Sequence, residues 1–189
     1  MEFKKIQLNG FKSFADKTTF LIENGLTGIV GPNGCGKSNI VESLRWAMGE
    51  TSAKSMRGSG MEDVIFSGTS NKASKNIAEV SISVNNPNYE GPIQYRELDE
   101  IHVRRKIEKD KGSKFYINNK EVRARDAQMF FADLSTGAHS PSMISQGRIG
   151  ALVTAKPTDR RAILEEAAGI SGLHVRRHEA ELRLGAAEN

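Results

Sequence analysis

The most informative part of the chain reads Gly31-Pro32-Asn33-Gly34-Cys35-Gly36-Lys37-Ser38. A glycine, four residues and then Gly-Lys-Ser is the spacing of the P-loop. Its glycines let the backbone turn tightly, so that successive N–H groups face phosphate oxygens. In such a loop Lys37 reaches the β- and γ-phosphates as a point charge, and the Ser38 hydroxyl binds Mg²⁺. The stretch therefore predicts a site for ATP and Mg²⁺.

The residues on either side of the loop support this prediction. The short apolar run 26–30 is typical of a buried strand, and Gly49 is a natural stop for a helix that follows the loop. One face of that helix is expected to carry Ile40, Val41, Leu44, Ala47 and Met48. The loop then lies between a strand and a helix N-terminus, where the helix dipole favours phosphate. A chance glycine-rich turn is the alternative, and the complete motif in this context argues against it.

Composition and charge set outer limits. The 189 residues suffice for one domain with a sizeable core and an appendage. No apolar run approaches the roughly 20 residues that span a membrane, and the N-terminus lacks the apolar stretch of a signal peptide. The single cysteine, Cys35, rules out an intramolecular disulfide and favours a reducing cytosol. The net charge of +4 permits an acidic partner such as nucleic acid.

Alternating apolar and polar residues predict an antiparallel sheet around and after the loop. Short turns at 110–113 and 118–119 join neighbouring strands into hairpins. This pattern is unlike the parallel sheet of a small P-loop kinase, which is the least favoured class. The strands are expected over residues 3–8, 18–22, 77–84, 101–107 and 114–118, and a helix over 125–134.

The segment from Val103 to Arg125 is strongly basic, with nine Lys or Arg residues against three acidic ones. A surface for DNA phosphates would show salt-sensitive, sequence-independent binding. The alternative is a solvated sheet edge, because lysines often protect exposed strands from pairing. The residues alone favour neither explanation.

Two stretches imitate motifs that complete an ATPase site, and both are rejected. Residues 129–133 end an apolar run on a carboxylate, but Leu134 follows where a second acid would position water. Residues 134–137 imitate the signature motif of ABC-type ATPases but lack its second glycine. His174 and His178 have metal-ligand spacing, yet they share a cationic stretch and no third ligand is evident.

The last segment predicts a helix that starts at Pro157, with Asp159 in its first turn. Ile163, Ile170 and Leu184 share one heptad position, and the pattern has no stop before the last residue. We expect the beginning of a coiled coil that has been cut short.

Together these pieces resemble the N-terminal head segment of SMC (structural maintenance of chromosomes) proteins of the bacterial condensin type. The resemblance implies an α/β P-loop NTPase fold, the N-terminal half of an ABC-type ATPase head with a mixed or antiparallel sheet. Residues 1–155 would form this lobe and residues 156–189 the helix that leads into the coiled coil. The matching residues are 6–14, 31–40, 61–66, 115–119, 145–149 and 160–170.

The resemblance also assigns residues to the nucleotide site. Gln146 resembles the Q-loop glutamine, which binds Mg²⁺ together with Ser38. Arg57 resembles an arginine that reaches the phosphates, Lys12 and Ser13 resemble residues that line them, and Asp63 borders the adenine. The nucleotide-binding set is then Lys12, Ser13, Gly31, Pro32, Asn33, Gly34, Cys35, Gly36, Lys37, Ser38, Asn39, Arg57, Asp63 and Gln146.

No catalytic residue is expected within this segment, because the family places the signature motif, Walker B and the catalytic glutamate in a C-terminal head segment. Further implied partners are a second SMC head, a kleisin subunit and DNA bound without sequence specificity. The DNA candidates are Lys120, Arg123 and Arg125. The chain departs from the family at residues 135–142, so side-chain roles there are not carried over.

The resemblance implies a cytoplasmic, nucleoid-associated ATPase in chromosome condensation and segregation, with no membrane partner. Two other functions stay open. One is a DNA-repair ATPase similar to RecN, against which residues 160–170 argue. The other is a DNA-binding scaffold whose nucleotide site no longer hydrolyses ATP.

Overall fold

The computed structural model describes residues 1–89 and 92–134, together with positions 156–158, 160, 161, 164, 177, 181, 184 and 185. Its strands are β1 (Glu2–Asn9), β2 (Thr18–Leu21), β3 (Ile77–Asn85), β4 (Glu100–Glu108), β5 (Gly112–Ile117) and β6 (Lys120–Val122). Its helices are α1 (Lys37–Ala47) and α2 (Ala124–Asp133), with short 3₁₀ turns η1 (Lys54–Met56), η2 (Met61–Val64) and η3 (Ile93–Tyr95).

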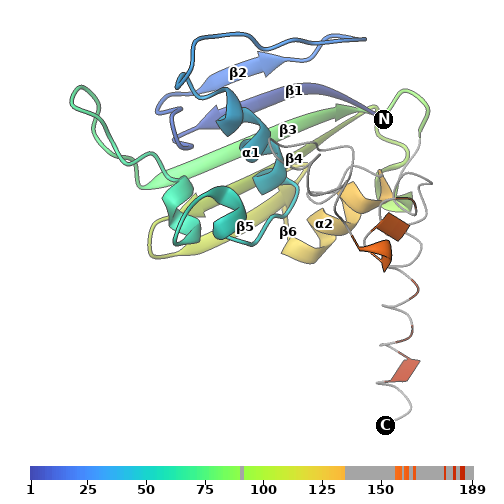
Figure 1. The fold of residues 1–189 in the computed structure, drawn as a ribbon. Helices are drawn as coiled ribbons and strands as arrows, with labels where there is room; N and C mark the ends of the chain where they lie inside the picture. Colours follow the sequence, from blue (N-terminus) through green and yellow to red (C-terminus); the bar gives the residue numbers. More distant parts are fainter. Residues whose placement is uncertain are drawn as a thin grey trace.

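The strands form one six-stranded sheet in the order β2-β1-β3-β4-β5-β6, and every neighbouring pair is antiparallel (Figure 1). The predicted antiparallel sheet is therefore confirmed. The β5–β6 turn places Asn118 and Asn119 at φ of 47° and 66°, as a tight hairpin turn requires. The pairing of β1 with β3 has a register shift between Phe3 and Lys5.

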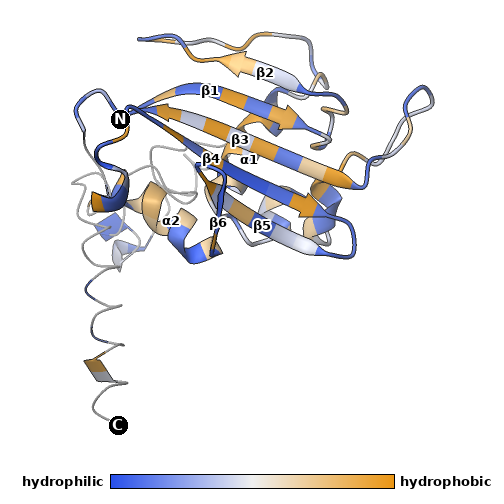
Figure 2. Ribbon diagram, turned by 180° about the vertical axis from the view of Figure 1, so that it is seen from behind, coloured by the Kyte–Doolittle hydropathy of each residue, from blue (hydrophilic) through white to orange (hydrophobic). Residues whose placement is uncertain are grey.

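Both helices cover the same face of the sheet, with α1 against β3 and β4 and α2 against β5 (Figure 1). On β4 the buried residues Ile101, Val103, Arg105 and Ile107 point toward this face, whereas His102, Arg104 and Lys106 between them are partly or fully exposed. Figure 2 shows the opposite face, on which the strands lie in front of α1. The largest fully buried side chains include Trp46, Phe11, Phe130, Phe131 and Leu8.

Helix α1 forms where the sequence predicts it, and Ile40, Ala47 and Met48 of the predicted face are buried. Val41 and Leu44 are only partly buried, whereas Trp46 is fully buried. The Trp46 ring packs 5.4 Å from the Phe11 ring, centroid to centroid. The largest apolar side chain of the helix thus turns toward the sheet, since burying an aromatic ring removes more apolar area than burying Val or Leu. Gly49, at φ of 107°, lies just beyond the helix as predicted.

The predicted strand over residues 26–30 is wrong. The segment pairs with no strand in the described part of the chain, and Leu26 and Val30 are 100% and 94% exposed. An apolar run of this kind indicates a strand only when another element covers it and satisfies its backbone. No described element does so here.

The helix predicted to start at Pro157 agrees with the structure. Pro157 and Thr158 are helical after Lys156, and the N–H of Arg160 donates to the Lys156 carbonyl at 3.0 Å. The coiled coil itself stays a prediction, as does the division at 155/156. Residues 135–142, Gln146, His174 and His178 lie outside the described residues. Among the described helices none is long and apolar enough to cross a membrane.

Candidate phosphate-binding site

The P-loop leads directly into α1 through glycines in left-handed backbone conformations. Gly34 and Gly36 have φ of 83° and 97°, which side chains rarely adopt. A Cβ atom built on Gly36 would lie 2.4 Å from the Ser13 hydroxyl oxygen. Glycine at this position therefore lets the turn after β1 approach the loop.

The N-terminus of α1 carries no competing negative charge. No side chain caps Gly36, and no acidic residue lies in the first turn. The first N–H groups of a helix have no partner within the helix, and the dipole makes this end positive. The loop and the first turn of α1 thus have the chemistry of an anion site.

Lys37 folds back over the loop. Its ammonium donates to the carbonyl oxygens of Gly31 and Pro32 at 2.5 and 2.6 Å, and lies 3.9 Å from the Cys35 sulfur. The charge is thereby held at the loop. The loop residues from Gly31 to Cys35 and the Ser38 side chain are exposed. A triphosphate fits this chemistry, because backbone N–H groups, a lysine and a hydroxyl converge here and the first turn of α1 carries no acidic residue.

A chain of hydrogen bonds brings two other predicted residues to the first turn of α1. The Asn39 side-chain Nδ2 donates to the Ser13 hydroxyl at 2.9 Å, and Arg57 Nη2 donates to the Asn39 side-chain oxygen Oδ1 at 3.1 Å. Ser13 belongs to the turn after β1, and Arg57 follows η1. The fold therefore gathers Ser13, Asn39 and Arg57 beside the loop, although they are far apart in the sequence.

Lys12 lies in the same cluster but points elsewhere. Its ammonium binds the Glu42 carboxylate and donates to the Met56 carbonyl at 2.5 Å. The Lys12 side chain is only 13% exposed. The sequence alone does not indicate that Glu42 is the carboxylate that holds Lys12. The available signal was an acidic residue one position from the apolar face of α1.

Asp63 shapes the loop that follows Arg57. One carboxylate oxygen accepts hydrogen bonds from the N–H groups of Ser59 and Gly60, at 2.6 and 3.0 Å, and from the Ser59 hydroxyl at 2.8 Å. These bonds lower the pKa of Asp63 below its usual 3.8, and the bond from the Gly60 N–H has the largest effect. Its expected place beside the adenine stays a prediction.

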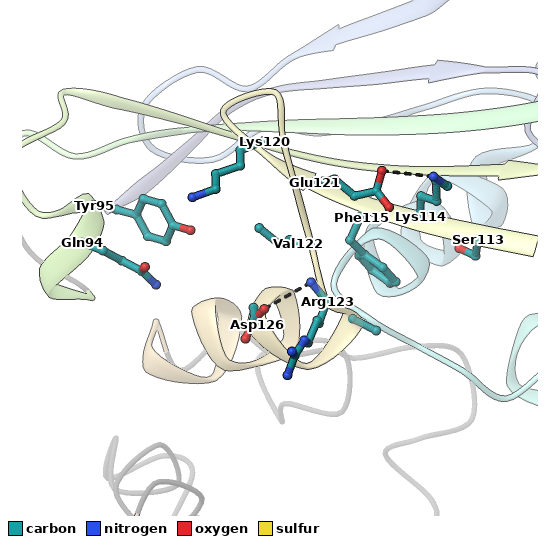
Figure 3. Close-up of a pocket in the computed structure, with 11 residues that line it drawn as sticks. Gln94, Tyr95, Ser113, Lys114, Phe115, Lys120, Glu121, Val122, Arg123 and Asp126 are labelled. Atoms are coloured by element: carbon teal, nitrogen blue, oxygen red, sulfur yellow. Dashed lines mark hydrogen bonds and ion pairs between the residues drawn. The ribbon is translucent and has the colours of Figure 1, made fainter.

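The DNA candidates lie around β6 and the start of α2. Lys120 and Arg123 line a cavity of about 650 Å³ together with Tyr95 and Asp126. In Figure 3 Lys120 extends toward Tyr95, whereas Arg123 points away from both. Arg125 is exposed in the first turn of α2.

The basic segment 103–125 does not form one surface. Arg105 is buried beneath α1, and its neighbours Arg104 and Lys106 lie on the opposite face of the sheet. Lys114 pairs with Glu121 at 3.1 Å. A run of like charges on a strand divides between two faces, so the sequence count overstates the charge of either one.

The comparisons with known proteins agree with this geometry. Residues 2–148 match the family model described as RecF/RecN/SMC N terminal domain. Chromosome partition protein Smc of Cereibacter sphaeroides is 57% identical over 188 residues, which is the whole of this chain and 16% of that protein. The Rhodopseudomonas palustris protein of the same name is 55% identical over the same share of both chains. The chain thus spans about one sixth of the length of these relatives.

Solved structures show the same similarity. The Smc head domain of Pyrococcus furiosus, solved with an extended coiled coil and bound to the C-terminal domain of ScpA, has a TM-score of 0.82 at 31% identity. The match covers 99% of this chain and 46% of that one. A second solved structure comes from work on ATP-driven dimerization and DNA stimulated activation of SMC ATPases. It has a TM-score of 0.78 at 31% identity, and the match covers 88% of this chain and 99% of that one. The chain therefore belongs to the RecF/RecN/SMC family, as an SMC N-terminal head segment.

Proposed function

We propose that this chain is the ATP-binding half of an SMC ATPase head that acts in chromosome condensation and segregation. The observation that carries the proposal is the P-loop itself, in which Lys37 lies over a glycine-rich turn at the uncapped N-terminus of α1. Lys37 would neutralise phosphate charge, and Ser38 with Gln146 would hold Mg²⁺. The magnesium ion would offset the charge of the β- and γ-phosphates. Among the described residues no cluster of His, Cys, Asp and Glu forms a separate metal site.

Hydrolysis would require groups from another segment. Among the described residues, the carboxylates of Glu42 and Asp63 lie near the predicted phosphate contacts and are engaged: Glu42 holds Lys12 and Arg57, and Asp63 accepts backbone N–H groups. A general base for water needs a carboxylate that faces the substrate. The proposal therefore assigns this base to a C-terminal head segment of the same protein.

The exposed apolar run 26–30 is the surface that such a segment would cover. Leu26 and Val30 are almost fully exposed, so no described element covers them. Val41 and Leu44 of α1 are only partly buried. Strands from the C-terminal head segment would pair with this run and complete a second sheet. The relatives are about six times longer than this chain and have room for such a segment.

The further proposed partners are a second SMC head and a kleisin. A solved SMC head that resembles this chain is bound to ScpA, and another belongs to work on ATP-driven dimerization. A cytoplasmic, nucleoid-associated protein is consistent with relatives named chromosome partition protein. These names also favour an SMC function over a RecN-like repair ATPase.

We propose that DNA contacts the β6–α2 corner through Lys120, Arg123 and Arg125. Contacts from basic side chains to phosphates release counterions, so affinity falls as salt rises. Each contact removed makes the plot of log affinity against log salt shallower, by about 0.9 in the magnitude of its slope. In the full-length protein, replacing Arg123 and Arg125 by alanine is expected to weaken duplex binding and to lower this slope by about two. Binding to labelled duplex measured over a range of salt concentrations gives both quantities.

The matched control is Arg104→Ala, on the opposite face of the sheet. It removes one positive charge, as a single Arg123→Ala variant does, and should leave the salt slope unchanged. Equal effects of the Arg104 variant and of a single Arg123 variant would show that only net charge matters, and would place DNA elsewhere.

The split site itself is tested by ATP turnover. We expect the chain alone to hydrolyse ATP at background rates and to become active when the C-terminal head segment is added. A scaffold without a working nucleotide site is the competing function, and it predicts no ATP binding that depends on Lys37.

A further inference from the structure

Glu42 is a carboxylate that the proposed hydrolysis does not use. It lies in the second turn of α1, and its side chain is only 11% exposed. Its two oxygens hold different cations: Oε2 binds the Lys12 ammonium and Oε1 lies 2.5 Å from Arg57 Nε. Replacing a buried ion pair by apolar residues is often neutral for stability. A stabilising role alone therefore explains little of this arrangement.

Arg57 is fixed by two residues of one helix. Nε pairs with Glu42 and Nη2 donates to Asn39, which lies three positions earlier on the same side of α1. Two contacts at different nitrogens set the plane of the guanidinium group. Within the part of the chain that the structure describes, Nη1 makes no hydrogen bond or ion pair, and the side chain is 60% exposed. Donors of Arg57 thus remain available to a ligand.

Glu42 also fixes the backbone that carries Arg57. The Lys12 ammonium, bound to Glu42, donates to the carbonyl of Met56, the residue before Arg57. Arg57 itself has φ of 55°, a left-handed conformation that is uncommon for arginine. The carboxylate therefore holds the side chain directly and holds the preceding peptide through Lys12.

This cluster continues into the P-loop. The Asn39 side chain accepts a hydrogen bond from Arg57 and donates one to the Ser13 hydroxyl. The Ser13 oxygen would lie 2.4 Å from a Cβ atom built on Gly36. The guanidinium group is consequently tied to the first turn of α1, from which phosphate-binding N–H groups project.

We propose that Glu42 is a positioning residue of the nucleotide site: it holds Arg57 with donors directed at an anion in the P-loop. The inference rests on the proposed function, because it requires that the loop binds a triphosphate. Glu42 touches no ligand and acts through Arg57 and Lys12. Its negative charge alone would repel a triphosphate, so positioning and charge predict opposite effects when the charge is removed.

The test is Glu42→Gln in the full-length protein, with the affinity for ATP measured by titration with a fluorescent ATP analogue. Loss of a group that supports a metal ligand typically costs ten- to a hundredfold in metal affinity, and by analogy we expect about tenfold weaker ATP binding here. In an Arg57→Ala background the same change should have no further effect, since the group that Glu42 positions is gone.

Glu50→Gln is the matched control. Glu50 is a buried carboxylate paired with Arg45 at 3.0 Å, beyond the opposite end of α1. The control should alter thermal unfolding at most, and leave ATP affinity unchanged. Unchanged or tighter ATP binding by the Glu42 variant, or equal weakening with and without Arg57, would overturn the proposal. Retention of ATP affinity in Lys37→Ala would instead overturn the proposed function.

Discussion

Replacing Lys37 by alanine is expected to weaken ATP binding by the full-length protein at least about a hundredfold. The ammonium lies over the loop, bonded to the carbonyls of Gly31 and Pro32, where it can exchange these partners for phosphate oxygens. Hydrogen bonds to charged groups contribute about 1.5–3 kcal/mol each, and two such bonds correspond to this loss. Titration with a fluorescent ATP analogue measures it directly.

Lys54→Ala controls for the loss of charge. Lys54 is an exposed lysine in η1, near Arg57 in the sequence, and its removal changes the net charge by the same amount. We expect ATP affinity to change less than about twofold, because exposed charges are strongly screened by salt. Similar losses in both variants would mean that general charge, and no specific P-loop contact, governs binding.

Replacing Arg105 by leucine is expected to lower the free energy of unfolding of the head by about 3 kcal/mol or more. Arg105 is 3% exposed, and its Nη1 donates to the carbonyls of Trp46 and Glu50 at 2.8 and 2.7 Å. Nε donates to the Ser113 hydroxyl at 2.8 Å. Leucine removes all three bonds, and the Trp46 carbonyl then keeps the longer bond from the Gly49 N–H at 3.1 Å.

The Arg105 guanidinium also stacks on two rings. It lies 4.5 Å from the centroid of Trp46 and 4.6 Å from that of Phe115. Burial lowers the pKa of Arg105 to about 10, so the group stays charged at neutral pH. It thereby joins the C-terminal end of α1, where a cation is favourable, to β4 and β5. Denaturant unfolding of the full-length protein, followed at the transition of the head, measures its contribution.

The neighbouring residue supplies the control. The Arg104 side chain is one third exposed, pairs with Glu79 at 3.6 Å and lies on the opposite face of β4. Arg104→Leu should cost about 1 kcal/mol or less, as exposed ion pairs usually do. If the two variants lose equal stability, Arg105 does not join helix and sheet in the way that we describe.

What the sequence predicts well is local. The P-loop, the helix after it and the antiparallel hairpins follow from glycine positions, periodicity and turn residues, each within a few tens of residues. The sequence also predicts the α2 helix. Because residues 129–133 lie within this helix, the rejection of a Walker B strand there is confirmed.

What the sequence misses depends on contacts between distant segments. The burial of Arg105 follows from the β4 register and from the position of α1 above it, neither of which composition reveals. The pairing of Glu42 with Lys12 joins residues 30 positions apart. The run 26–30 fails as a strand because its apolar pattern anticipates a neighbour that the described residues do not contain.

The central claim is that this chain holds ATP and that hydrolysis needs a base from the C-terminal head segment. The most direct measurement is ATP turnover by the chain alone, by the chain with that segment added, and by the same mixture carrying Lys37→Ala. We predict background turnover alone, restored turnover in the mixture, and background again in the variant. Turnover by the chain alone that Lys37→Ala abolishes would contradict the claim.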